Sequence, residues 1–352
     1  MKTYKSLTYF LVLVVVVSLT GCESCNPKHV ENPPSIVTYE ADASIPDYEK
    51  MPLRTYQTAE NARLDETTAR ENVKHLLKYA SVTNEFDLAK PVKEGEVLYF
   101  RNPNDPSAML NVNMVNGDIS LNRGTKGYMG FNSTRGLVKN EEAEKMAKEH
   151  FDKLGFAPID KSSMVVGHVG GVNMTMHDDK EGNRIYEKLT TVRFDRMLDN
   201  IPVLGHSRLL VQMGEKGVIQ SIIKQWTPLS SVAVKSDSLV SKDEVKKSIE
   251  DHLMGENKGA SKIIIKKINL IYYDNGKGII EPALHIIGLV LVPQSSKDST
   301  LMSFKHDTVE PLLKNPRISY TFKGEDHPAA RQSDAIDNNS PMPRGIDEKN
   351  KY

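Results

Sequence analysis

Residues 191–205 read TVRFDRMLDNIPVLG, and residues 209–222 read LLVQMGEKGVIQSI. Pro202 fixes the backbone of a turn, and Gly205 permits conformations that a side chain would bar. The glycines at 214 and 217 enclose a second turn. Together these signals predict three antiparallel strands over residues 185–197, 203–213 and 218–226.

Amphipathic helices are predicted over residues 66–80, 141–154 and 242–254, because apolar residues recur there at helical spacing. Asn140 is a candidate N-cap of the second helix, and Ser241 with Glu244 forms a capping-box pattern before the third. Further strands are expected at residues 97–101, 108–115 and 118–121 after the first helix, at 164–168 after the second, and at 263–273 and 279–292 after the third. The expected fold class is therefore α+β, with a helix-plus-antiparallel-meander module repeated three times.

The stretch quoted above resembles the PepSY and FTP modules found in propeptides of thermolysin-like metallopeptidases and in many secreted bacterial proteins. The positions that carry the resemblance are Ile201, Pro202, Val203, Gly205 and Gly217. The resemblance covers about residues 140–290 and implies a PepSY/cystatin-like fold. In the family, such modules act as peptidase inhibitors, folding helpers or binding modules.

The N-terminus has a basic start, an apolar run over residues 10–17, and then Leu19-Thr20-Gly21-Cys22. This order is typical of a secretory signal. The last four residues resemble the lipobox of bacterial lipoproteins, which implies cleavage before Cys22 and acylation of that cysteine, with palmitate among the expected chains. Glu23 follows, and in Gram-negative families this favours the outer membrane. The alternative is a plain signal or signal anchor in which Cys22 is incidental.

Six segments are expected in the chain. They are a lipoprotein signal peptide at 1–21, a linker at 22–60, a first α+β module at 61–136, a PepSY/FTP-like module at 137–232, a third α+β module at 233–323 and a disordered tail at 324–352. The linker and tail are rich in turn-forming and polar residues and have few apolar ones.

The composition excludes several classes of function. The 352 residues contain 46 Lys+Arg and 46 Asp+Glu, so the basic excess that nucleic-acid binding requires is missing. The two cysteines, Cys22 and Cys25, cannot form a disulfide scaffold or a cysteine-rich metal site in the body of the chain. No His-Glu-x-x-His, Gly-x-Ser-x-Gly or phosphate-binding glycine loop occurs in the sequence.

These absences favour a protein that is not an enzyme and that has no metal or cofactor. The main hypothesis is an envelope lipoprotein that acts as a binding or peptidase-inhibitory module. Its expected partners are the membrane, through the lipid, and an extended peptide or a secreted peptidase, which could add to an exposed sheet edge. Two alternatives stay open: an envelope hydrolase with an unrecognised site, and an accessory subunit of a surface assembly.

Overall fold

Three helices form where the apolar spacing predicts them. The computed structural model describes residues 36–124, 126–128, 130–178, 182–295 and 298–320, and its α-helices are α1 (Glu66–Tyr79), α2 (Asn140–Lys153) and α3 (Lys242–Glu256). The capping box of Ser241 and Glu244 is confirmed at the start of α3. The predicted Asn140 cap is wrong, because Asn140 is the first residue of α2 and the preceding Lys139 makes no side-chain capping bond. No helix in these ranges is long and apolar enough to cross a membrane.

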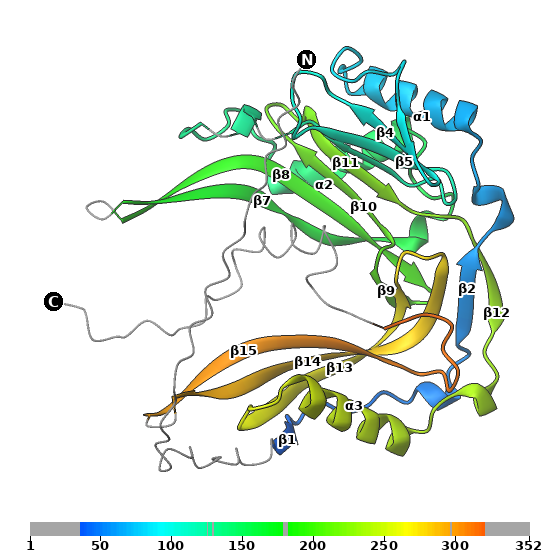
Figure 1. Ribbon diagram of the computed structural model, residues 1–352, viewed down its shortest axis with the longest axis vertical. Helices are drawn as coiled ribbons and strands as arrows, with labels where there is room; N and C mark the ends of the chain where they lie inside the picture. The colour runs from blue at the N-terminus through cyan, green and yellow to red at the C-terminus, as the bar shows by residue number, and fades with distance from the viewer. Residues whose placement is uncertain (1–35, 125, 129, 179–181, 296–297, 321–352) are drawn as a thin grey trace, which may run out of the picture. The chain divides into compact units, whose positions relative to one another are not determined.

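Strands make up far more of the described chain than helices do (Figure 1). The strands are β1 (Ile36–Tyr39), β2 (Arg54–Thr58), β3 (Val92–Glu94), β4 (Val97–Arg101), β5 (Met109–Asn113), β6 (Ile119–Asn122), β7 (Met164–Asp178), β8 (Gly182–Leu198), β9 (Ile201–Gly205), β10 (Arg208–Met213), β11 (Ile219–Gln225), β12 (Leu229–Ala233), β13 (Lys262–Asp274), β14 (Ile279–Ser295) and β15 (Asp298–Pro311).

The predicted fold class, repeated helix-plus-meander modules, is wrong. The described strands join into one hydrogen-bonded network of 15 strands, and their pairing crosses every predicted module boundary. Strand β6 pairs with β11, β2 pairs with β12, and β9 runs parallel to β13 with Val203 opposite Tyr272. A helical or alternating pattern in the sequence does not show which distant strands will pair, so this mixed, mostly β architecture was not predicted.

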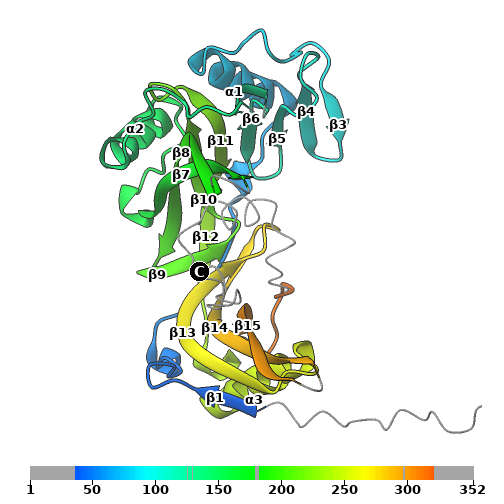
Figure 2. The same cartoon turned by 90° about the vertical axis from the view of Figure 1, so that its left-hand side faces the viewer.

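The helices lie against the sheet in two places (Figures 1 and 2), and a large apolar core lies beneath them in each. The first core packs α1 and α2 against β4, β5, β6, β8, β10 and β11, with Leu76 and Phe151 fully buried. The second core packs α3 against β13 and β14. A third, smaller cluster of Ile271, Ala283 and Val309 contacts Ile318, which follows β15 in the chain. Each core buries one face of a sheet against helix or chain, which is the common reason that such layers are stable.

Parts of the predicted linker are strands. Residues 36–58, in the expected linker 22–60, supply β1 and β2, and β1 runs parallel to β13. Pro282 lies in β14 between the residues that pair with β2 and those that pair with β15. Because one partner strand ends there before the next begins, the missing N–H of proline breaks no ladder. The expected signal peptide at 1–21 and tail at 324–352 lie outside the described residues.

Candidate functional site

Ile201, Pro202, Val203 and Gly205, which carry the PepSY/FTP resemblance, lie in β9, which pairs with β8 on one side and with β13 on the other. Ile201 and Val203 are buried in the second core, whereas Pro202 is exposed and lies opposite Met197 in the β8–β9 hairpin. Gly205 has a φ of +113°, and a Cβ there would lie 2.1 Å from the backbone oxygen of Asp274. These positions fix the backbone where β9 meets β13, so their role in the structure is architectural.

Gly217, the last residue that carries the resemblance, lies in the turn between β10 and β11. It has a φ of +79°, and a Cβ there would lie 2.0 Å from the sulfur of Met146 on α2. His150 of α2 lies with Nε2 3.2 Å from the Gly217 carbonyl oxygen. The glycine therefore allows the turn to approach α2 closely. Cys22, the expected lipidation site, lies outside the described residues.

A buried polar cluster joins the start of β10, the end of β13 and the β5–β6 hairpin. His206 Nε2 lies 2.7 Å from an oxygen of Asp118, and the Ser207 hydroxyl donates to Asp274 at 2.6 Å. Burial alone would lower the pKa of His206, but the hydrogen bond and charge of Asp118 outweigh it, so the pKa lies above its ordinary value. Asp118 also accepts a hydrogen bond from Asn116 at 2.7 Å.

This cluster contains Ser, His and Asp but lacks the arrangement of a catalytic triad. Ser207 donates to a carboxylate, while His206 is held by a different carboxylate. A nucleophilic serine needs the imidazole as its base and open space for a substrate. The cavity beside the cluster has a volume of about 10 Å³, which is about the room for one water. The cluster therefore ties three segments together.

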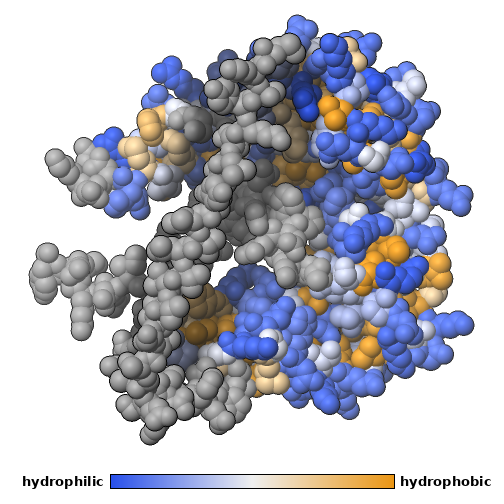
Figure 3. Space-filling model, viewed as in Figure 1, coloured by the Kyte–Doolittle hydropathy of each residue, from blue (hydrophilic) through white to orange (hydrophobic). Residues whose placement is uncertain are grey.

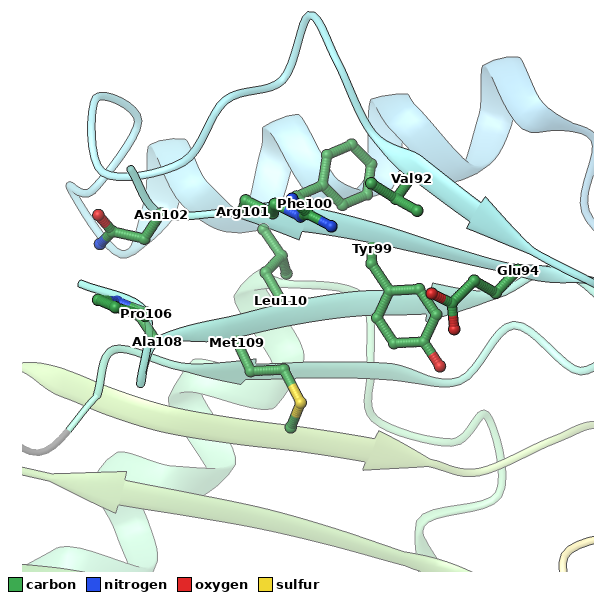
Figure 4. Close-up of a pocket in the computed structure, with 10 residues that line it drawn as sticks. All are labelled: Val92, Glu94, Tyr99, Phe100, Arg101, Asn102, Pro106, Ala108, Met109 and Leu110. Carbon is green, nitrogen blue, oxygen red and sulfur yellow. The ribbon is translucent and has the colours of Figure 1, made fainter. Parts of the chain in front are cut away.

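A shallow pocket of about 480 Å³ lies over β3, β4 and β5 (Figure 4). Tyr99 lies next to Glu94, and Met109 projects from the neighbouring strand. Met109 is 47% exposed. The pocket is a depression on the surface of short strands, and its two charged lining residues, Glu94 and Arg101, do not pair with each other in an ion pair among the described residues.

Strand β15 presents the strongest binding feature of the described chain. It pairs along its length with β14, and no strand in the described ranges pairs with its other edge. Three large apolar side chains on it are well exposed, Leu301 at 49%, Met302 at 41% and Phe304 at 48%. An unpaired edge with apolar side chains is a template for an added strand. This strand was not predicted from the sequence, because residues 298–311 (DSTLMSFKHDTVEP) lack a regular alternation of apolar and polar residues.

Among the described residues, no group of three or more His, Cys, Asp or Glu side chains is arranged so that it could hold a metal ion. His177, in a segment with two methionines that could favour copper, lies with Nδ1 2.8 Å from Asn183 Oδ1 across the β7–β8 hairpin. That contact is part of the hairpin.

Comparisons with known proteins give a weak structural likeness. No family model matches the sequence, and no curated protein gives a significant match. An uncharacterized protein from Eubacterium rectale ATCC 33656 has 12% identity and a TM-score of 0.45, over 82% of this chain and 92% of that chain. The C-terminal domain of YpeB from Bacillus megaterium has 11% identity and a TM-score of 0.32, over 72% of this chain and 99% of that chain.

At these TM-scores the likeness carries no inference about ligand or partner. The chain thus has low-identity structural neighbours, and one of them is a YpeB domain.

Proposed function

We propose that this chain is a non-enzymatic lipoprotein of the bacterial cell envelope, anchored through Cys22, that binds an extended peptide as an added strand on β15. The anchor is supported by the lipobox-like residues 19–22 and by Glu23, which favours the outer membrane of a Gram-negative cell. The resemblance to propeptide modules supports a segment of a secreted peptidase as the partner. The observation that carries the binding role is the edge of β15, which no described strand pairs and which bears exposed apolar side chains.

Main-chain hydrogen bonds would give the affinity of this interaction. An edge strand offers unpaired N–H and C=O groups, and an added strand satisfies them without any catalytic group. The 14 residues of β15 give an edge long enough for a peptide of several residues.

Side chains on the two faces of β15 would give selectivity. Phe304 and Met302 lie opposite Val290 and Val292 of β14, on the face that α3 covers. Leu301 lies opposite Pro293, on the other face. An added strand places alternate residues beside these two groups, so we expect a peptide with apolar residues on both faces near its centre.

Site-specific photo-crosslinking in intact envelopes tests this proposal. A photoreactive residue at Ser303 of β15 is expected to capture one recurring extended segment of a partner, identified by mass spectrometry of the crosslinked peptides. The same photoreactive residue placed at Ser230 of β12 is the matched control. Ser230 is also exposed, and β12 is also an outer strand, although a shorter one. The substitutions Met302→Lys and Phe304→Lys should reduce the Ser303 crosslink about tenfold, because they place charge on a surface that would be desolvated.

Two outcomes contradict the proposal. Equal crosslinking at Ser303 and Ser230 would mean that β15 has no selective partner. A crosslink from Ser303 to β15 of a second copy would mean that this edge serves self-association instead of peptide capture.

A further inference from the structure

A second pocket lies at the end of the first core, where the segment after α2 meets β2 and β12. It has a volume of about 570 Å³, within the range of small-molecule sites. Arg196 and Leu198 of β8, Trp226 after β11, Tyr56 of β2 and Leu229 of β12 line it. Figure 3 shows hydrophobic residues gathered on the right-hand side of the molecule, in the region of β2 and β12.

Arg196 is a buried cation in this pocket with an unused donor. It follows Val192 and Phe194 on the helix-facing side of β8, where an apolar residue would continue the core, and it is only 7% exposed. One guanidinium nitrogen donates to the Thr227 carbonyl oxygen at 2.9 Å, and the group lies 5.1 Å from the centre of the Trp226 ring. The buried Nε has no hydrogen-bond partner among the described residues.

The charge of Arg196 is not neutralised by an ion pair in the described part of the chain. Burial lowers the pKa of Arg196 to about 10, so the group stays protonated at neutral pH. The charge of Asp274 favours the protonated form of Arg196, but the two groups do not form an ion pair among the described residues. A buried guanidinium that lacks a directly paired carboxylate is costly, and a bound anion would offset that cost.

A second cation and one carboxylate complete the charged lining. Lys224 lines the pocket and donates to the Gly117 carbonyl oxygen at 2.9 Å. Burial lowers the pKa of Lys224 from its ordinary value. The carboxylate of Asp160 accepts hydrogen bonds from the Ser162 N–H at 3.0 Å and hydroxyl at 2.6 Å, so it is engaged by its own turn. The lining therefore carries two cations against one carboxylate.

The rest of the wall is apolar. Phe156 and Trp226 are buried at its base, and Pro158 and the fully exposed Ile159 form the rim. The Tyr56 hydroxyl donates to Asp199 and is thereby occupied. We infer that this pocket binds a small organic anion in which a carboxylate, paired with Arg196, is attached to an aromatic or aliphatic group that packs between Trp226 and the segment after α2.

Tryptophan fluorescence tests this inference directly, because Trp226 is the single tryptophan of the sequence. The probes are 3-phenylpropionate for a free acid and N-acetyl-L-leucine for a peptide C-terminus, each compared with its neutral amide. Saturable quenching by at least one acid, with a dissociation constant of about 1 mM or tighter, is the expected result for ligands of this size. Binding by both acids would mean that the pocket accepts the carboxylate of a free acid as well as that of a peptide. Binding by N-acetyl-L-leucine alone would identify a peptide C-terminus as the ligand.

Variants separate binding from folding. Arg196→Gln is expected to weaken the acids about tenfold or more, because a charge-assisted hydrogen bond is lost. If Arg196→Gln does not fold, Ile159→Glu replaces an exposed rim residue, leaves the core intact and adds a negative charge that should also weaken the acids. Lys216→Gln, at a highly exposed lysine far from this lining, is the control. Equal affinity for acid and amide, no quenching by any probe, or full affinity in the Ile159→Glu variant would each overturn the inference.

Discussion

Replacing Gly205 with alanine should unfold the junction of β9 and β13. The glycine ends β9 opposite Asp274, and its φ of +113° lies in a region that side chains disfavour. A Cβ would lie 2.1 Å from the Asp274 carbonyl oxygen, which already accepts the His206 N–H at 3.0 Å. Backbone atoms cannot rotate away as a flexible side chain can, so the two strands must separate.

The cost follows from two contributions. The backbone conformation alone costs an alanine about 1–3 kcal/mol. Separating the strands weakens the His206 to Asp274 hydrogen bond, which contributes about 1 kcal/mol. Gly205→Ala should therefore lower the free energy of unfolding by about 2–4 kcal/mol, near the upper end of single substitutions.

Urea unfolding followed by circular dichroism and Trp226 fluorescence measures this loss, with two other glycines as controls. Gly155 has a φ of +68°, but no atom lies within 4 Å of the place that a Cβ would take, so Gly155→Ala should cost only about 1–2 kcal/mol. Gly255 lies inside α3 without a positive φ or a close neighbour, so Gly255→Ala should stabilise by about 0.5–1 kcal/mol. A Gly205→Ala loss no larger than that of Gly155→Ala would refute the steric reasoning.

Three further predictions concern other parts of the chain. Glu281→Gln should lower the free energy of unfolding by about 1–3 kcal/mol and speed amide hydrogen exchange over residues 312–320. The reason is that the fully buried carboxylate accepts hydrogen bonds from the backbone N–H and from Nε of Arg317. Unchanged exchange would contradict this prediction. The hydrogen bond to Glu310 raises the pKa of His252 to about 9. The stabilisation that protonated His252 gives the folded protein is therefore complete below about pH 6.5 and is lost as pH rises through 9. The thermal unfolding temperature of His252→Gln should be close to that of the parent at high pH and lower than that of the parent at about pH 6. Cys22→Ser should move the protein from the membrane to the soluble fraction on cell fractionation, and retention in the membrane would exclude the lipid anchor.

Local features of this fold could be predicted from the sequence, and long-range pairing could not. The helices were predicted closely, since residues such as Val73 and Leu76 recur at helical spacing and Ser241 with Glu244 specifies a start. The pairing of β9 with β13 could not be predicted in this way, because it depends on contacts between residues far apart in the sequence, such as the close approach of Gly205 to Asp274. The predicted repeat of modules followed from reading each helix with only its nearest strands.

One residue of the candidate pocket could have been predicted from the alternation of buried and exposed positions in the sequence. On β8, Val192, Phe194 and Arg196 share one face, and the first two are fully buried. A cation at the third position of a buried face needs a group that stabilises its charge. Trp226, 30 residues later, does this only in part, through a cation–π contact. What the sequence does not contain is the approach of the segment after α2 and of β12, which closes the pocket around that cation.

Two sets of buried polar residues differ in the space beside them. Ser207 and His206 have carboxylate partners, although Asp118 Oδ1 in the same cluster has no hydrogen-bond partner among the described residues. The cavity beside them is about 10 Å³ and leaves no room for a substrate. Arg196 keeps a donor without a partner among the described residues and lines about 570 Å³. An unsatisfied buried polar group destabilises the fold, so its presence is explained where a bound ligand or another function compensates for that loss. Residue type alone would favour the serine and histidine as the functional groups, whereas the space beside each group favours the arginine.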